Sequence, residues 1–433
     1  MDVGAATWNG PIQLSADAAM GAASGASLAL SGPIDLSGHA LTFVGAGTSS
    51  VPGAITGTGT LAQGGTGTLQ LGGADTFTGT LAVNSGTVQF TASSVLTNGQ
   101  DVTVVSGATL DVHDFTESLG SLAGAGSVTL GTTTGGALTV GGNGASTTFS
   151  GGISGTGAFA KVGAGTFTLT GASSFTGGTT LTAGTVIAGN NSAFSSGSVT
   201  FNGGALASDS GTRSLANSIV VNNVAGNQIT GGNSITLTGA ASGAGTIEVN
   251  FSDNTKSVTV NPSAANSFAP GMVRLTSGTL LLGGANKIGG STGVNFNGGT
   301  LNTGGFSDTL GALTLSANST LDFGTSNNVH LQFSSAAWTG GGLTVNNWTG
   351  TEFTSGNPDQ FLVASAGPVD STFLSEISFT GHAPGSIAFN VGGGLYEIVP
   401  VPEPATIFGA IGLVAFVGFR ERRRIGRLFR KAA

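Results

Sequence analysis

Apolar and polar residues alternate along short segments of this chain, and glycines separate the segments. The alternation is clear in three successive segments, whose apolar positions are Leu69 and Leu71, Leu81 and Val83, and Val88 and Phe90. A period of two over a few residues is the pattern of a β-strand with one face turned inward. Glycines recur at intervals of about 7 to 12 residues, where a turn needs positive φ or close backbone approach. No stretch before residue 404 sustains helical spacing with caps, so short strands are predicted throughout.

Two segments of the chain repeat one another. Residues 55–90 and 153–188 align without gaps and share 17 of 36 positions. The shared positions include the pairs Gly57/Gly155, Gly67/Gly165, Phe77/Phe175, Gly79/Gly177 and Gly86/Gly184. Looser copies run through residues 239–251 and 273–289, and the stretch 196–211 resembles 291–305. This is self-similarity rather than compositional bias.

The repeats predict the fold class. Short strands bent at glycines can bury one face only by stacking on neighbouring copies. We therefore predict an all-β, right-handed parallel β-helix with rungs of roughly 20 residues. A β-sandwich, with strands every 8 to 12 residues or so, is the alternative. The gapless repeat favours the solenoid, and we divide it into an N-terminal cap region (1–52), a repeat body (53–324) and a β-rich C-terminal region (325–399).

Composition agrees with many strands and tight turns. The 433 residues include 78 glycines, only 7% are charged, and none is cysteine. Average proteins have about 7% glycine and about 25% charged residues. Low charge argues against charge-driven disorder, and glycine without a three-residue period argues against collagen. The lack of cysteine excludes a disulfide framework, a thiol nucleophile and a cysteine-ligated zinc site.

Charge is distributed unevenly. Residues 1–400 carry five basic side chains against 18 acidic ones. An acidic body repels phosphate backbones, so we expect no nucleic-acid partner. The last 14 residues contain the other seven basic side chains, namely Arg420, Arg422, Arg423, Arg424, Arg427, Arg430 and Lys431.

The basic cluster follows directly on an apolar segment. Residues 405–419 contain no charge, and the low-polarity span counted from Val399 has 21 residues. A bilayer core requires roughly 20 helical residues, so this segment predicts one transmembrane helix. Arg420, Arg422, Arg423 and Arg424 would stop transfer and hold that end in the cytoplasm, with residues 1–400 across the membrane. The alternative is a buried C-terminal helix with a solvated basic tail.

The repeat resembles a known unit. The stretch GTGAFAKVGAGTFTLTGASSFTGGTTLTAGTV, residues 155–186, is similar to the passenger-associated β-strand repeat of autotransporter-type proteins. The first copy departs from it at Gln63 and Gly64, where the repeat has a lysine and an apolar residue, as in Lys161 and Val162. The resemblance is specific for architecture and says little about activity.

The C-terminal region resembles a sorting signal. Residues 321–404 are similar to the region that precedes the anchor in β-helical PEP-CTERM proteins. Residues 400–433 resemble the tripartite PEP-CTERM sorting signal. The motif is formed by Val401, Pro402, Glu403 and Pro404, and an apolar segment and arginines follow it. The resemblance implies a transient membrane anchor that an exosortase-type protease recognises and cuts. It implies an inner-membrane precursor whose body is then released to the cell surface or beyond.

The N-terminal residues do not read as an export signal. MDVGAATWNGPIQ has neither a basic start nor an apolar core. An exported body needs such a signal, so we interpret Met1 as an internal or misassigned start, or as the start of a trimmed chain.

Residues with catalytic chemistry are sparse. The richest stretch holds Asp111, His113, Asp114 and Glu117. β-Helices can place a carboxylate pair in a side groove, where a retaining glycosidase needs oxygens about 5 Å apart. A rung corner, with polar side chains satisfying backbone groups, is the favoured interpretation.

Other candidate motifs are weaker still. His39, His330 and His382 are solitary and lack metal-ligand spacing. Residues 289–293 match the G-x-S-x-G elbow without its strand-to-helix context. There is no Gly-Lys dipeptide for a phosphate loop and no calcium-binding nonapeptide. Trp8, Trp338 and Trp348 could stack on sugars, although Trp348 is better explained as a cap or core residue.

Two functional classes follow. We expect a non-enzymatic, structural or adhesive protein of the cell surface or extracellular matrix, without catalytic residues, cofactor or metal. Extracellular polysaccharide or other surface proteins would be its further partners. The alternative is a polysaccharide lyase or glycosidase on the same scaffold, which requires a groove with clustered carboxylates and a basic residue. A self-exporting autotransporter is disfavoured because the C-terminus lacks amphipathic barrel strands.

Overall fold

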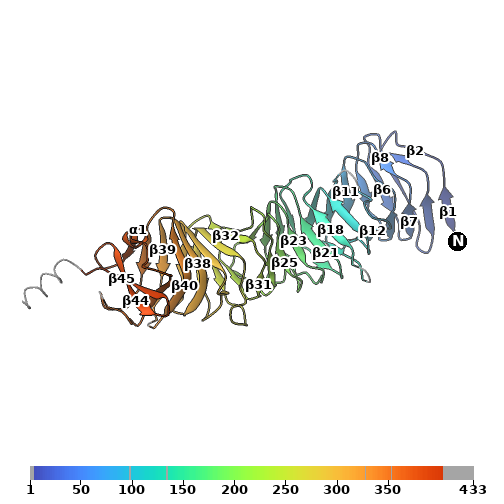
Figure 1. Cartoon of the computed structure of the whole chain (residues 1–433). Coiled ribbons are helices and arrows are strands. Elements are labelled where there is room, and N and C mark those ends of the chain that lie inside the picture. Colours follow the sequence, from blue (N-terminus) through green and yellow to red (C-terminus); the bar gives the residue numbers. More distant parts are fainter. Residues whose placement is uncertain (1–3, 97–98, 133–134, 327, 353, 403–433) are drawn as a thin grey trace, which may run out of the picture.

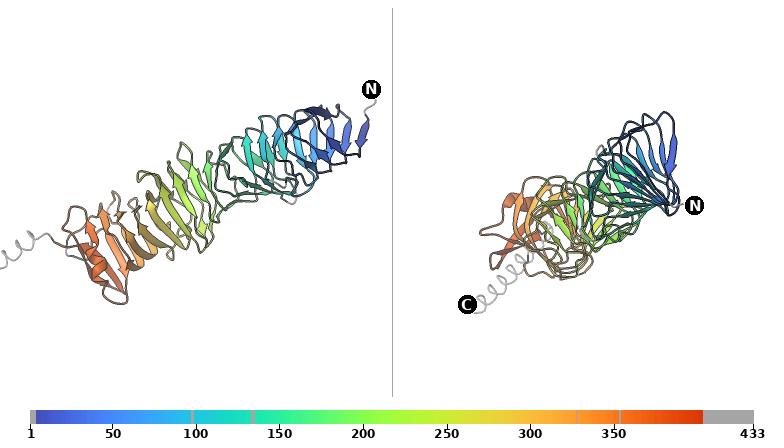
Figure 2. Two further views of the ribbon diagram at one scale, coloured as in Figure 1. Left: turned by 90° about the horizontal axis from the view of Figure 1, so that it is seen from above. Right: turned by 90° about the vertical axis from the view of Figure 1, so that its right-hand side faces the viewer.

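The chain winds into an elongated parallel β-solenoid. The computed structural model describes residues 4–402, except 97–98, 133–134, 327 and 353. It has about 16 turns, stacked into a rod with its N-terminal turns at one end and residues 371–402 at the other (Figures 1 and 2). Within the described residues, helix is confined to α1 (Ser371–Ser375). The predicted parallel solenoid is confirmed, and the sandwich alternative is wrong.

Each turn contributes strands to three faces of the coil. Face 1 begins as an eight-stranded parallel sheet. Its strands are β1 (Ala5–Trp8), β4 (Ser27–Leu30), β7 (Thr48–Val51), β10 (Thr68–Leu71), β12 (Thr87–Phe90), β14 (Thr109–Asp111), β17 (Ser127–Thr129) and β20 (Ile153–Ser154). It resumes as β27 (Arg213–Leu215), β30 (Ile235–Leu237), β33 (Ser257–Val260), β35 (Thr279–Leu282), β37 (Thr300–Asn302), β39 (Ser319–Asp322), β41 (Leu343–Asn346) and β43 (Ile377–Phe379).

Face 2 is shorter and more irregular. It starts with β2 (Ile12–Gln13), β5 (Ile34–Asp35) and β8 (Ile55–Thr56). It continues with β15 (Thr116–Leu119), β18 (Ala137–Val140), β21 (Ala158–Lys161), β23 (Thr179–Leu181), β25 (Val199–Phe201), β28 (Ile219–Val221) and β31 (Ala241–Ser242). A parallel bridge between Asp75 and Leu96 lies between the two sheets, so the face continues where no full strand forms.

Face 3 runs almost the whole length of the rod. Its strands are β3 (Ala18–Gly21), β6 (Leu41–Val44), β9 (Leu61–Gln63), β11 (Thr80–Val83), β13 (Asp101–Val104), β16 (Ser121–Gly124), β19 (Thr147–Phe149), β22 (Thr166–Leu169), β24 (Thr185–Ala188), β26 (Ala205–Ser208), β29 (Gln228–Gly231), β32 (Thr246–Phe251), β34 (Met272–Ser277), β36 (Gly293–Asn297), β38 (Asp308–Ala317) and β40 (His330–Trp338). The last two are long enough to pass the corner between faces 2 and 3.

The pairing register places like positions of successive turns above one another. In β10 and β12, Leu69 pairs with Val88 and Leu71 with Phe90. All four side chains are fully buried, whereas the intervening Gln70 is only half-buried. Successive turns therefore share one continuous apolar core, and the predicted alternation of inward and outward positions is confirmed.

Buried carboxylates satisfy backbone N–H groups where the chain turns a corner and enters face 2. Asp75 is 1% exposed and accepts a hydrogen bond from Ile55 N at 2.7 Å. Glu117, fully buried, accepts from Val95 N at 2.8 Å and from Leu96 N at 3.1 Å. Each carboxylate thus bonds the turn before its own, some 20 residues earlier in the chain. These bonds supply partners that the strand ladders cannot provide at the corners.

Buried amides perform the opposite task, donating to carbonyl oxygens. Gln100 donates through Nε2 to Asp75 O and Phe77 O, both at 3.0 Å. Asn217 donates through Nδ2 to Gly197 O at 2.7 Å and to carbonyls of the same corner at 3.1 and 3.2 Å. The corners of the coil are therefore held from inside by polar side chains of adjacent turns.

The C-terminal end departs from the parallel pattern. β42 (Gln360–Ala364) pairs in parallel with β40, and then antiparallel with β45 (Leu395–Pro400), which pairs antiparallel with β44 (Ser386–Gly392). Glu397 is buried here and accepts from Gly356 N at 2.6 Å. In the described residues no helix is long and apolar enough to cross a bilayer. The predicted transmembrane segment, residues 405–419, lies outside them.

The inward alternation can be tested with a matched pair of substitutions in β22. Leu169→Asp places a charge at a fully buried position, and we expect it to destabilise the coil by several kcal/mol. Thr168→Asp, one residue away on the outer surface, should be nearly neutral. Apparent unfolding midpoints in denaturant measure both. Equal losses of stability would contradict the assigned facing.

Because burial raises the pKa values of several carboxyl groups, we expect the stability of the fold to decrease as pH rises. Burial raises the pKa of Asp75 to about 7, against the lowering effect of the Ile55 bond. Burial also raises the pKa values of Glu117 and Asp308. A carboxyl whose folded pKa exceeds its unfolded value binds protons on folding, so its contribution is complete at low pH and lost as pH rises through the folded pKa. The thermal midpoint should therefore rise as pH falls from about 8 to about 5.

Asp75→Asn is the matched variant for this effect. The amide oxygen keeps an acceptor for Ile55 N but does not titrate, so the slope between about pH 6 and about pH 8 should be shallower than in the parent chain. Differential scanning calorimetry across this range measures the slope. A midpoint that instead increases steadily with pH, or an unchanged slope in the variant, would contradict the assignment.

Candidate functional site

The stretch with the richest candidate chemistry is divided between the outside and the inside of the coil. Asp111 ends β14 on the outer surface, where it accepts from Gln89 Nε2 at 2.8 Å and from Thr129 Oγ1 at 2.6 Å. His113 lies in the following turn at φ 56° and donates its backbone N–H to Asp111 Oδ1 at 2.9 Å. Glu117 points the other way, into the core. The carboxylates of Asp111 and Glu117 therefore do not converge on one groove.

The remaining member of that stretch also serves the backbone. Asp114 accepts a hydrogen bond from Thr132 N at 3.1 Å. This is the corner geometry that the sequence favoured, in which polar side chains satisfy peptide groups of the neighbouring turn.

The G-x-S-x-G match lies in a turn between strands. Ser291 is exposed, and the next residue, Thr292, is buried with its Oγ1 bonded to Pro270 O at 2.9 Å. β36 follows directly from Gly293, so the strand-to-helix context of a nucleophile elbow is absent from this stretch.

Three of the four histidines lie close to a carboxylate. His382 Nδ1 is 2.7 Å from Glu352 Oε1, His39 Nδ1 is 3.7 Å from Asp17 Oδ1, and His113 Nδ1 is 3.8 Å from Asp111 Oδ2. Each is a separate pair in a different part of the rod. Over the described residues, no group of three or more His, Cys, Asp or Glu is placed to hold a metal ion.

The tryptophans differ in exposure. Trp8 and Trp338 are 55% and 40% exposed. Trp348 is buried, donates through Nε1 to Asp359 O at 2.8 Å and contacts the ring of Phe379 at a centroid distance of 5.1 Å. The interpretation of Trp348 as a core residue is confirmed.

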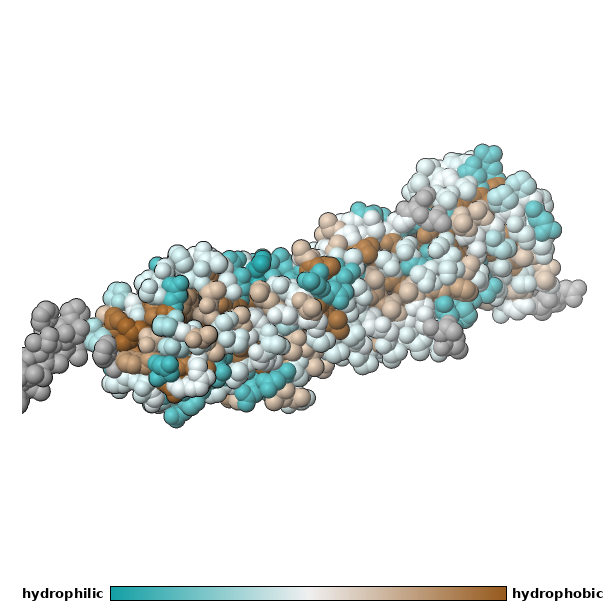
Figure 3. Space-filling view, viewed as in Figure 1, coloured by the Kyte–Doolittle hydropathy of each residue, from teal (hydrophilic) through white to brown (hydrophobic). Residues whose placement is uncertain are grey.

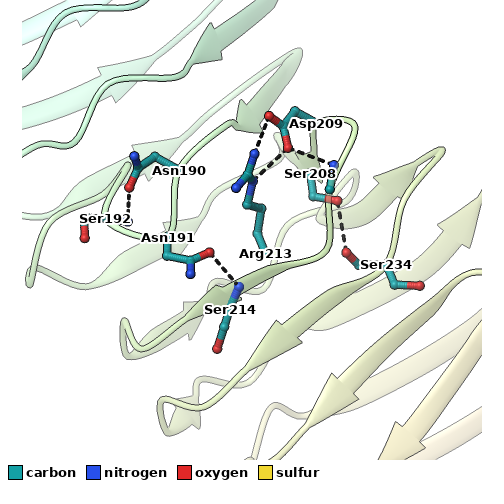
Figure 4. A network of polar contacts seen from close by, with 9 residues as sticks. Asn190, Asn191, Ser192, Ser208, Asp209, Arg213, Ser214 and Ser234 are labelled. Carbon is teal, nitrogen blue, oxygen red and sulfur yellow. Dashed lines mark hydrogen bonds and ion pairs between the residues drawn. The ribbon is translucent and has the colours of Figure 1, made fainter.

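An ion pair that the sequence did not predict closes the turn between β26 and β27. Arg213 donates through Nε to Asp209 Oδ1 at 2.7 Å and through the guanidinium to Oδ2 at 2.6 Å (Figure 4). Hydrogen bonds from Arg213 lower the pKa of Asp209, and Asp209 raises that of Arg213. Beside it, Asn191 Oδ1 accepts from Ser214 N at 3.1 Å (Figure 4). The network positions the strand with which face 1 resumes.

The corner inside the first repeat copy is capped by a buried glutamine. Gln63 is 3% exposed and donates through Nε2 to Gly65 O and Gly67 O, both at 2.9 Å. These carbonyls belong to the glycine turn that joins β9 to β10.

The second copy has a buried lysine at the same position. Lys161 is 1% exposed and donates through Nζ to Val162 O at 2.7 Å and to Gly163 O at 2.9 Å. Burial lowers the pKa of its ammonium group. The departure of the first copy at Gln63 is therefore conservative in function, since either side chain supplies inward donors for the turn carbonyls.

The two copies occupy different faces of the coil. In the first copy the capped corner joins β9 on face 3 to β10 on face 1. In the second it joins β21 on face 2 to β22 on face 3. The repeat thus encodes a strand–corner–strand unit that fits at more than one corner of the rod.

The outer surface carries little charge. The side shown in Figure 3 is mostly pale, with scattered hydrophilic and hydrophobic residues and no extended field of either kind. Several hollows interrupt the surface of the described residues. One of about 490 Å³ lies at the C-terminal end beside Ser335, Val363 and Asp370, and one of about 290 Å³ lies beside Glu248 and Arg274.

The predicted sorting residues lie at the edge of the described chain. Val401 and Pro402 follow β45 and are half-buried. Glu403, Pro404 and the basic cluster Arg420, Arg422, Arg423 and Arg424 lie outside the described residues.

Comparison with known families identifies the repeat. Residues 61–90 and 159–188 match the model of the Passenger-associated-transport-repeat. No curated protein and no solved structure matches the chain. The matched segments begin at β9 and within β21 and end with β12 and β24. The chain therefore contains two passenger-associated transport repeats, each built around one internally capped corner of the solenoid.

Proposed function

We propose that this protein is an exported structural or adhesive component of the cell surface or extracellular matrix. The observation that carries the proposal is the pair of passenger-associated transport repeats set within one solenoid that shares a single apolar core. A rod of stacked turns spans distance with few residues of special chemistry, which suits a stalk or a matrix element. Extracellular polysaccharide and other surface proteins are its proposed partners.

The proposed route of export uses the C-terminal signal. The motif Val401-Pro402-Glu403-Pro404, the apolar segment 405–419 and the arginines that follow would form a transient anchor in the inner membrane. Proline disfavours regular structure at the residue before it, so Pro402 and Pro404 would favour an accessible peptide for an exosortase-type protease between the body and the anchor. The body would then be released to the outside.

The proposed role is not enzymatic. Support comes from the carboxylates of the richest stretch, which are used for corner bonds rather than directed together. A polysaccharide lyase or glycosidase on the same scaffold is the rival proposal. A retaining pair would need two carboxyl groups about 5 Å apart in one groove.

The sorting proposal predicts the fate of the C-terminus. In a host with its sorting protease, mature protein should appear outside the cell and lack residues 405–433. In a host without it, the full-length chain should remain in the membrane fraction. The reverse orientation is disfavoured because each charged residue at the centre of a spanning helix costs about 2.5 to 3.5 kcal/mol on insertion scales. Fractionation followed by mass spectrometry of the C-terminal peptide measures both results.

A triple substitution tests the basic cluster. Retention during export should weaken when Arg422, Arg423 and Arg424 are changed together to Glu, because the stop signal is lost. The same three positions changed to Lys keep the charge and should behave as the parent chain. Extracellular protein that ends at Ala433, or a soluble cytoplasmic chain with its tail uncut, would refute the sorting proposal.

A further inference from the structure

A polar hollow lies at the corner between faces 2 and 3, where the connection from β28 to β29 bulges outward. Its volume is about 290 Å³, and it is lined by the loop Asn223–Asn227 together with Thr246, Glu248 and Arg274. The last three side chains come from β32 and β34, the next two turns along face 3. The hollow therefore has a loop as one wall and two neighbouring strands as its floor.

The loop wall is held in place from inside. Asn227 is 2% exposed and donates through Nδ2 to Asn222 O at 2.8 Å and to Val224 O at 3.1 Å. Its Oδ1 accepts from Gly203 N, in the preceding turn, at 2.7 Å. The wall is thus preorganised before any ligand arrives. It presents the exposed Asn223 amide and the Val224 side chain, which is 43% exposed.

The floor places a cation beside a carboxylate without pairing them. Glu248 and Arg274 are register partners on adjacent strands. Glu248 uses its oxygens on Gln228 Nε2, at 3.0 Å, and on the Thr276 hydroxyl. Among the hydrogen bonds and ion pairs within the described residues, none involves the Arg274 guanidinium. The other arginine described, Arg213, is paired with Asp209 through Nε and Nη2.

We infer that this hollow binds a carboxylate-bearing saccharide, such as one unit of a polyuronate chain. The free guanidinium offers a planar fork of donors that matches a carboxylate. Glu248, Thr246 and Asn223 offer acceptors and donors for sugar hydroxyls, and Val224 offers apolar contact for a ring face. The residues of the hollow thus match both the acid group and the hydroxyls of one sugar unit.

The neighbouring Glu248 makes the hydroxyl groups of the ligand important. Any anion at Arg274, a uronate included, lies beside the Glu248 carboxylate and is repelled by it. A sugar unit can offset this repulsion because its several hydroxyls, at fixed positions on the ring, can donate to Glu248. The chain is also negatively charged as a whole, at −8, so bulk attraction of a polyanion cannot supply the affinity. Binding must depend on the local fit of Arg274 and its neighbours.

Isothermal titration calorimetry tests this inference with the full-length chain in non-ionic detergent at about physiological ionic strength. The probe is an oligogalacturonate, compared with a neutral hexose oligomer of equal length and with an oligoglutamate of equal charge. Arg274→Gln should weaken oligogalacturonate binding about tenfold or more, since a hydrogen bond to a charged group is worth about 1.5–3 kcal/mol. Arg274→Lys, which keeps the charge but not the fork, should show an intermediate loss.

Lys256→Gln is the matched control for charge. Lys256 lies just before β33, at the corner on the other side of face 3, and its removal changes net charge equally. This variant should bind as the parent chain does, and the thermal midpoints of all variants should agree. No binding by the parent chain, equal losses in the Arg274→Gln and Lys256→Gln variants, or equal affinity for oligoglutamate would each overturn the inference.

The inference deepens the proposed adhesive role and rests on it, because an extracellular location brings the hollow into contact with polysaccharide. The two fail separately. Oligogalacturonate that does not bind, while mature protein is found outside the cell, removes the saccharide site alone. A chain that binds the probe but stays in the cytoplasm with its tail intact removes the proposed function.

Discussion

The solenoid depends on satisfying backbone groups at its corners. Strand ladders pair peptide groups along each face, but the chain must leave the ladder at every corner, and a peptide group buried there without a partner destabilises the fold. Asp75 and Glu117 supply acceptors at such corners, whereas Gln63, Gln100 and Lys161 supply donors. Each reaches either its own turn or the adjacent one. The apolar core can be continuous only because these polar groups close its edges.

The same constraint explains the glycine content. Successive corners stack so closely that a side chain would collide with the turn below: a Cβ on Gly79 would lie 1.6 Å from Gly59 O. Elsewhere the requirement is conformational, as at the equivalent positions Gly57 and Gly155, with φ of 85° and 107°. Both kinds of glycine lie where the chain turns between faces. Glycines therefore let successive corners stack closely, and buried polar side chains bond the backbone groups at those corners.

Much of the fold could be predicted from local pattern, and much of the surface chemistry could not. Period-two alternation gives the inward set, and Leu69 and Leu71 are buried as expected. The alternation of inward and outward residues does not show which residues of adjacent turns lie next to one another. The neighbouring residue is about 20 positions away in the chain, and the lengths of the corners vary. For this reason no local pattern indicates that Glu117 accepts from Val95 N or that Arg213 pairs with Asp209. The sequence shows that the first copy has Gln63 where the second has Lys161. Only the geometry of the turn shows that both side chains donate to the turn carbonyls.

A regular coil presents the same few small polar side chains turn after turn, so specific chemistry must come from departures from regularity. The connection from β28 to β29 is one such departure: Asn227 withdraws into the core to hold the loop, and the loop rises beside Arg274. At other corners a buried amide only bonds the backbone of the turn, whereas Asn227 also holds the loop that forms one wall of the hollow. In a β-solenoid, stability and recognition can therefore be built from the same element, with a longer corner converting an internal cap into the wall of a binding site.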